Sequence, residues 1–320
     1  MLRRGYGTFM SEDFNPLVSI VIPVYNGSNY LREAIDSALN QKYRNIEVLV
    51  INDGSNDNGA TSALALSYGN KIRYFEKENG GVASALNLGI KEMRGEYFSW
   101  LSHDDVYNSN KIRTQIEYLR GVDYRKIVLY SDYCCIDEKS ELISCIDLNL
   151  TDAKNFYYNL IMEGIHGCTL LIPKECFVKK GMFNEKLKTT QDYDLWFRFG
   201  EEYEFKHIPS HLVQYRLHSE QDSIKKDRYC LDERNNLFIN AMNSINNKME
   251  HLDWFFNFSK SFLKSNLYRA SISALRIYFY NGLSQEYLLR KSEAFCKSLV
   301  LFIYIFLKYL YRSTFLLNRH

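Results

Sequence analysis

Three groups of polar residues follow short apolar runs, and each carries side chains that could bind a charged ligand. Pro23-Val24-Tyr25-Asn26 closes the first run, Asn52-Asp53-Gly54-Ser55 closes the second, and His103-Asp104-Asp105 follows the fourth. In an open α/β sheet, ligands bind outside the carboxyl ends of the strands. If these runs are parallel strands, the three groups converge on one binding site.

The adjacent carboxylates of Asp104 and Asp105 call for a positive partner, because like charges repel and burying either one unpaired is costly. A hard divalent cation takes oxygen ligands and is held by one or two carboxylates together with substrate phosphates. We therefore expect Mg²⁺ or Mn²⁺ and a phosphate-bearing ligand here. The alternative is a solvated helix cap, since a helical pattern begins near Ser109.

Another polar stretch, Asn79-Gly80-Gly81, precedes a helical segment. Glycine allows close backbone approach, and a helix N-terminus favours an anion. Asn79 and Gly80 are therefore candidate nucleotide-binding residues, although a tight turn explains them too. Likewise Asp53 alone could be a turn or cap residue, and Tyr25 a half-buried aromatic. The dinucleotide fingerprint G-x-G-x-x-G and the phosphate-loop signature G-K-[ST] do not occur here.

The elements that would position these residues alternate along the chain. Strand-like runs cover Val18–Val24, Ile46–Ile51, Lys71–Phe75, Tyr97–Leu101, Ile127–Tyr130 and Thr169–Ile172. Helix-like stretches cover Asn29–Asn40, Asp57–Tyr68 and Val82–Met93. This alternation predicts an α/β fold with a mainly parallel sheet flanked by helices.

We place this α/β domain at residues 17–225, and the residue pattern on either side of it is different. Residues 1–16 contain no apolar core typical of a signal peptide, so we expect a flexible tail. Residues 226–320 predict a C-terminal helical region. Its segment 297–312 is strongly apolar but shorter than the roughly 20 residues of a spanning helix. It suits a helix in a membrane interface, against the main domain, or in a homodimer contact.

The composition narrows the class of protein. An apolar share of 46% with 15% aromatic residues indicates a globular chain, and a net charge of +2 gives no nucleic-acid footprint. The seven cysteines form no CxxC pair, and the neighbours Cys134 and Cys135 are poorly placed for chelation. We expect reduced, partly buried thiols in a cytosolic protein.

The motifs VSIVIPVYN, IEVLVINDGS, ENGGVASALNLGI, SWLSHDDV and TTQDYDLWFR resemble those of the family-2 glycosyltransferases, in order and spacing, over residues 17 to about 223. The resemblance implies a GT-A fold and inverting transfer of a sugar from a nucleotide diphosphate, with Mg²⁺ or Mn²⁺. By position, Pro23, Tyr25 and Asp53 would hold the nucleoside. Asp104 would face the ribose or metal-bound water, and Asp105 would ligate the metal. Many relatives have an acidic residue where this chain has Ser102.

Two later motifs complete the resemblance. Asp192 matches the general base, with Gln191 in place of the usual glutamate; a helix N-cap is the alternative for Asp192 and more so for Asp194. The stretch YRLHSEQDS makes Arg216 a candidate diphosphate ligand and His218 a candidate metal ligand. His166 could line the acceptor side or be a buried structural residue.

These features predict an inverting glycosyltransferase that uses a UDP-sugar. The usual roles of the family that this chain resembles, together with the apolar C-terminal segment, favour a glycan or lipid-linked acceptor in cell-surface polysaccharide synthesis. They also favour a cytoplasmic location, with peripheral contact at the inner face of a membrane. Two rivals stay open: a non-catalytic nucleotide-binding subunit that docks through its C-terminal helices, and a nucleotidyltransferase with a related sheet.

Overall fold

The computed structural model describes residues 14–120, 126–148, 156–162, 164–219, 221, 227–246, 252–264, 267, 269–275 and 304. The chain divides into two compact units, one of Met1–Asn149 with Ile165–Gln221 and one of Leu150–Gly164 with Asp222–His320. The expected division into residues 1–16, 17–225 and 226–320 stays a prediction. In the structure, residues 150–164 group with residues 222–320.

The elements of the first unit follow in chain order: β1 Val18–Val24, α1 Leu31–Leu39, β2 Ile46–Asn52, α2 Ala60–Leu66, the 3-10 turn η1 Gly69–Lys71, β3 Arg73–Glu76, α3 Val82–Glu92, β4 Tyr97–Trp100, β5 Val106–Tyr107, α4 Lys111–Leu119, β6 Ile127–Ile136, β7 Leu142–Ile146, the 3-10 turn η3 Gly167–Thr169, β8 Ile172–Pro173, α6 Lys174–Lys180, α7 Gln191–Phe199 and β9 Glu204–Arg216. The second unit contains α5 Phe156–Met162, α9 Asp227–Asn246 and α10 Leu252–Lys264.

The larger sheet has the strand order β3-β2-β1-β4-β8. The pairs β1–β2, β2–β3 and β1–β4 are parallel, and only β8 runs antiparallel, beside β4. The mainly parallel sheet predicted from the sequence is therefore confirmed. Because the last residues of β1 and β2 pair in register (Val24 with Asn52), the polar groups that follow these strands start from the same edge.

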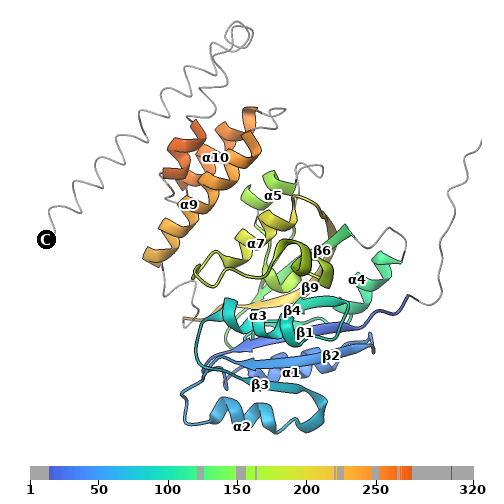
Figure 1. Ribbon diagram of the computed structural model, residues 1–320. Helices are drawn as coiled ribbons and strands as arrows, with labels where there is room; N and C mark the ends of the chain where they lie inside the picture. Colours follow the sequence, from blue (N-terminus) through green and yellow to red (C-terminus); the bar gives the residue numbers. More distant parts are fainter. Residues whose placement is uncertain are drawn as a thin grey trace, which may run out of the picture. The chain divides into compact units, whose positions relative to one another are not determined.

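Helices cover both faces of this sheet, with α3 on one side and α1 and α2 on the other (Figure 1). Every residue of β1 is buried, as its continuous apolar pattern requires. On one face Ile20 and Ile22 share a core with Ile35 of α1. On the other face α3 packs closely: a Cβ added to Gly89 would lie 2.3 Å from Val21 Cγ1, so glycine permits this approach.

The second sheet, with the order β5-β9-β6-β7, was not predicted. Its longest strand, β9, lacks a β-branched run and contains Pro209, which argues against a strand in sequence reasoning. The parallel register with β6 jumps there, from Ser131 opposite Ile208 to Asp132 opposite His211. The proline is thus accommodated at a bulge, and the strand continues to Arg216.

The cysteine prediction was wrong for one pair. Cys134 of β6 and Cys145 of β7 form a disulfide, whereas Cys135, Cys168 and Cys176 are free and buried. The physical reason is the antiparallel register of β6 and β7, which sets Cys134 directly opposite Cys145. Because successive side chains of a strand alternate between faces, the neighbouring Cys135 points away from this pair.

The second unit is a helical assembly with an aromatic core. Phe238 of α9 stacks on Phe262 of α10 at 4.9 Å, and Tyr158 of α5 lies 5.4 Å from Phe258 of α10. Within the described part of the chain, none of the helices has both the length and the apolar character needed to cross a membrane. The interfacial segment predicted at 297–312 lies outside the described residues apart from Tyr304.

Candidate active site

The carboxyl ends of β1 and β2 are tied together by a short network. Asp53 N donates to Val24 O at 2.8 Å, and the side chain of Asn26 exchanges hydrogen bonds with Asn56 at 2.7 and 2.8 Å. Pro23 is buried, whereas the Tyr25 side chain is 44% exposed. The edge therefore presents Tyr25 to solvent from a fixed backbone, with its ring available to a planar ligand.

Asp53 organises the loop that carries Asn79 and Gly80. Its Oδ1 accepts from Lys77 Nζ at 2.7 Å and from Gly80 N at 3.0 Å, and its Oδ2 accepts from Gly81 N at 2.7 Å. Asn79 Nδ2 donates a hydrogen bond to the Asp53 backbone carbonyl at 2.9 Å. Asp53 is almost fully buried by these contacts, so its lone pairs are largely used within the protein.

Gly54 allows this loop to approach. Its φ of +71° lies in the left-handed region, and an added Cβ would lie 2.6 Å from Asn79 N and 3.0 Å from Lys77 O. Both atoms belong to backbone and could not rotate away. The glycine after Asp53 is therefore required by the packing of residues 77–79 against the strand end.

Asp104 is buried and hydrogen-bonded to a predicted metal ligand. Its Oδ2 lies 2.8 Å from His218 Nε2, and the His218 ring lies 5.3 Å from that of Tyr30. Although burial acts to raise it, the pKa of Asp104 is held below its usual value by the charge of His103 and by hydrogen bonds from Ser102 and His218. Asp104 is thus a carboxylate in an environment that favours its charged form.

Asp105 lies deeper and has an incomplete set of partners. Its Oδ1 accepts from Arg216 N at 3.0 Å, while its buried Oδ2 accepts no conventional hydrogen bond. The weak thiol donor of Cys168 and His166 Nε2, at 3.9 Å, face this oxygen. Burial and the neighbouring Asp104 carboxylate raise the pKa of Asp105. An under-bonded carboxylate oxygen beside a second carboxylate is a position that a bound cation would satisfy.

Arg216 holds this pair of carboxylates in place. Its side chain has no exposed surface, its backbone N binds Asp105, and its Nε donates to the Asp104 carbonyl at 2.8 Å. The rest of the guanidinium donates to Asp137 O, Ser140 Oγ and Glu33 Oε2, and it lies 4.5 Å from the Tyr30 ring centroid. All of these partners are protein groups, so in this arrangement the guanidinium is a scaffold for the aspartates.

Sequence reasoning missed several of these partners. Glu33 in the first turn of α1, Ser140 in the β6–β7 turn and Lys77 after β3 carry no motif, and their roles depend on contacts between distant segments. Lys77 lies two residues before Asn79, but its role could be expected only if Asp53 were known to face that loop.

The acceptor-side prediction, Asp192, comes from a helix rather than from a strand end. Asp192 lies in the first turn of α7, is partly exposed, and its Oδ1 accepts from Tyr193 N at 2.9 Å. The N-cap position belongs to Thr190, so neither Asp192 nor Asp194 is the cap residue. Asp194 instead pairs with Arg198 at 2.9 Å, one turn along the helix. His166 is partly exposed, and the desolvation of its ring lowers its pKa to about 4.

Sequence comparison identifies relatives of part of this chain. Residues 19–173 match the family model Glycosyl transferase family 2. An uncharacterized glycosyltransferase of Rickettsia felis is 55% identical over 214 residues, which cover 66% of this chain and 36% of that protein. The hyaluronan synthase of Pasteurella multocida is 32% identical over 216 residues, or 66% of this chain and 21% of that protein. The chain thus spans about a third of the first relative's length and a fifth of the second's.

Solved structures agree on the fold. S. aureus TarS 1–349, in complex with UDP-GlcNAc, aligns with a TM-score of 0.59 at 17% identity, covering 90% of this chain and 81% of that one. The mannosyltransferase PcManGT of Pyrobaculum calidifontis, in complex with GDP-Man and Mn²⁺, aligns with a TM-score of 0.56 at 15% identity, covering 97% and 91%. These likenesses confirm the predicted GT-A-like fold.

Proposed function

Because this chain belongs to glycosyl transferase family 2, we propose that it moves a sugar from a nucleotide-diphosphate donor, a UDP-sugar, to a hydroxyl of a glycan or lipid-linked acceptor. The single observation that carries the proposal is the buried Asp104–Asp105 pair, held by Arg216, with one carboxylate oxygen that lacks a conventional hydrogen bond. The UDP-GlcNAc bound to TarS supports the choice of a UDP donor, and the hyaluronan synthase supports a polysaccharide product.

The nucleoside lies over the ends of β1 and β2 in this proposal. The exposed ring of Tyr25 stacks on the base, and Pro23 shapes the backbone beneath it. Asp53 has two roles in this proposal. Its carboxylate fixes the loop of Asn79 and Gly80, and it binds the base by giving up one of its hydrogen bonds to that loop. Asp104 faces the ribose.

The residues present suit a hard divalent cation. Asp105 offers an under-bonded carboxylate oxygen, and Asp104 with His218 lies beside it, so Mg²⁺ or Mn²⁺ would be held there. Bound in that position, the cation would offset the negative charge that develops on the leaving diphosphate. Arg216 enters the proposal as a positioning residue for the two aspartates, no longer as a diphosphate ligand.

Asp192 is the proposed general base. Its carboxylate takes the proton of the acceptor hydroxyl while that oxygen attacks the anomeric carbon from the face opposite the diphosphate, which inverts the configuration. A single displacement of this kind requires no enzyme nucleophile. The membrane-face location predicted from the sequence remains part of the proposal, supported by the apolar character of residues 297–312.

The test compares two aspartates of α7. Asp192→Asn should abolish sugar transfer while donor affinity stays within about twofold, because only proton removal is lost. Asp194→Asn, which removes the ion pair with Arg198 on the same helix, should leave transfer largely intact. Loss of donor binding in a folded Asp192→Asn variant would contradict the base role.

Measuring consumption of the donor distinguishes an enzyme from a non-catalytic nucleotide-binding subunit. The enzyme should release UDP slowly from its donor even without acceptor, and EDTA should suppress that release. A wild-type protein that binds the donor but never consumes it, with or without added Mn²⁺, would favour the subunit.

A further inference from the structure

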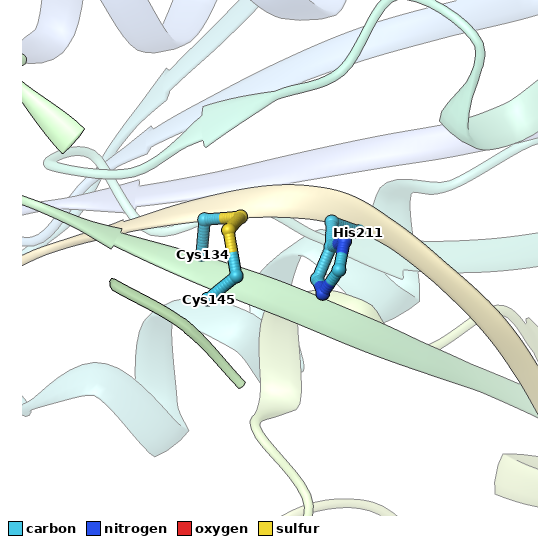
Figure 2. A group of neighbouring side chains, drawn as sticks. All are labelled: Cys134, Cys145 and His211. Carbon is cyan, nitrogen blue, oxygen red and sulfur yellow. A yellow bond between two sulfur atoms is a disulfide. The ribbon is translucent and has the colours of Figure 1, made fainter. Parts of the chain in front are cut away.

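A second group of metal-ligand side chains lies on the other sheet and takes no part in the proposed transfer. Cys134 of β6, Cys145 of β7 and His211 of β9 place their sulfur and ring-nitrogen atoms within 4.8 Å of one another. Figure 2 shows the imidazole of His211 beside the disulfide that joins the two cysteines. Three neighbouring strands therefore contribute one soft or borderline ligand each.

The strand register explains why these three residues meet. Cys134 lies directly opposite Cys145 in the antiparallel pair of β6 and β7. On the other side of β6, Asp132 lies opposite His211 in β9, next to the bulge at Pro209. Because residues two apart on a strand share a face, Asp132 and Cys134 point the same way, and His211 lies diagonally across from Cys134.

Two carboxylates surround the same imidazole. Asp147 Oδ1 lies 2.8 Å from His211 Nε2, and oxygens of both Asp132 and Asp147 are within 4.8 Å of the His211 ligand atom. Asp132 is already engaged, since its Oδ1 contacts His207 Nε2 at 2.7 Å and accepts from Leu148 N at 2.9 Å. Asp147 is 68% exposed and His211 is 39% exposed, so an ion can reach Asp147 and the imidazole from solvent.

We propose that Cys134, Cys145, His211 and Asp147 form a zinc site when the disulfide is reduced. An external dithiol reduces the disulfide to two thiols and is itself oxidised to a cyclic disulfide. Binding of Zn²⁺ then converts the two thiols into thiolate ligands and releases two protons. The imidazole and the Asp147 carboxylate complete four-coordination in exchange for their mutual hydrogen bond.

The geometry needs only local change. A tetrahedral zinc with Zn–S bonds of about 2.3 Å spaces two sulfur ligands by about 3.8 Å. Rotation about the Cα–Cβ bonds of two cross-strand cysteines provides that spacing without altering the strand register. Reduction followed by zinc binding therefore replaces the disulfide between β6 and the edge strand β7 with a zinc cross-link that also includes β9.

The ligand set distinguishes this site from the proposed catalytic one. Thiolates with an imidazole select zinc, whereas Mg²⁺ and Mn²⁺ prefer carboxylate oxygen. The inference does not depend on the proposed function, because none of its residues takes part in donor binding there. Its failure would therefore leave the glycosyltransferase assignment untouched.

Cobalt(II) is the probe, because a thiolate bound to cobalt gives a charge-transfer absorption in the near ultraviolet. The full chain is reduced with dithiothreitol, desalted without oxygen, and titrated with CoCl₂. We expect the band to saturate at one equivalent, to disappear on adding Zn²⁺, and to be absent from the oxidised protein. Circular dichroism checks that the reduced chain keeps its sheets.

Variants assign the band to this site. Cys134→Ser/Cys145→Ser should abolish it, and His211→Ala should weaken cobalt affinity at least tenfold. Cys168→Ser is the matched control, since Cys168 lies with Asp105 and His166 in a different cluster, and it should keep the band. A band that survives in the double variant or vanishes in Cys168→Ser would overturn the proposal. So would its absence from reduced wild type, or a loss of sheet on reduction that Zn²⁺ does not restore.

Discussion

Replacing Arg216 by lysine keeps the charge but removes the fork that spans several partners. The guanidinium donates four side-chain hydrogen bonds, to Asp104 O, Asp137 O, Ser140 Oγ and Glu33 Oε2. A lysine ammonium has one nitrogen and cannot reach all of them. The substitution thus distinguishes two roles of Arg216: a buried side chain that positions the aspartates through its hydrogen bonds, and a positive charge that attracts the diphosphate.

The magnitude follows from these partners. Glu33 is about half exposed, and water can replace its lost bond. If the ammonium keeps one of the other three acceptors, two bonds of about 1 kcal/mol each are lost. The poorly bonded charge also stays buried, so we expect a loss of about 3 kcal/mol, near the lower end of the roughly 3–5 kcal/mol for breaking a buried ion pair.

Urea unfolding measures this loss. Two of the three tryptophans, Trp100 and Trp196, lie in the first unit, so all variants are compared in a Trp254→Phe background, where tryptophan fluorescence reports on that unit. Arg113→Lys is the matched control. Arg113 pairs with Glu117 across one helical turn and both side chains are half exposed, so the change should cost under about 0.5 kcal/mol. A cost below about 1 kcal/mol for Arg216→Lys, combined with a large loss of donor affinity, would refute the scaffold role and restore the diphosphate role.

Two further substitutions test the loop after Asp53 and the buried Lys111 of α4. Gly54→Ala should lower the free energy of unfolding by about 2 kcal/mol or more, because the φ of residue 54 is +71° and the added Cβ would clash with Asn79 N. Gly59→Ala is the control, since Gly59 also has a positive φ but open space around its Cβ position. In the same urea assay it should cost only about 1 kcal/mol. Burial lowers the pKa of Lys111 to about 7, so unfolding takes up a proton between that value and 10.5. The stability of wild type relative to Lys111→Met should therefore rise with pH in this window, by up to about 1.4 kcal/mol per unit; a difference independent of pH would contradict this.

The sequence was informative where local pattern decides structure. The run Val18–Val24, apolar apart from Ser19, became β1 with the predicted bounds, because a strand covered on both faces carries few polar residues. The helix after it was predicted to within two residues, as its buried positions Leu31, Ala34, Ile35 and Ala38 recur on one face.

Long-range pairing was beyond such reasoning. β9 was missed because its partners on β6 are more than 70 residues away and Pro209 disguises the strand. The disulfide joins residues only 11 apart and was missed for a different reason: no strand was predicted at β7, and only the β6–β7 register brings Cys134 to Cys145. Arg216 was predicted as a diphosphate ligand, and its burial among protein acceptors could not be read from the motif, because those acceptors come from distant segments of the chain.

In the proposed enzyme, Asp105 and its neighbours bind a cation together with the donor's diphosphate. Calorimetric titration of UDP into the wild type and Asp105→Asn, each with Mn²⁺ and with EDTA, measures that binding. We predict Mn²⁺-dependent binding by the wild type that falls at least tenfold in the folded variant. UDP binding of equal strength in EDTA and in Asp105→Asn would contradict the claim.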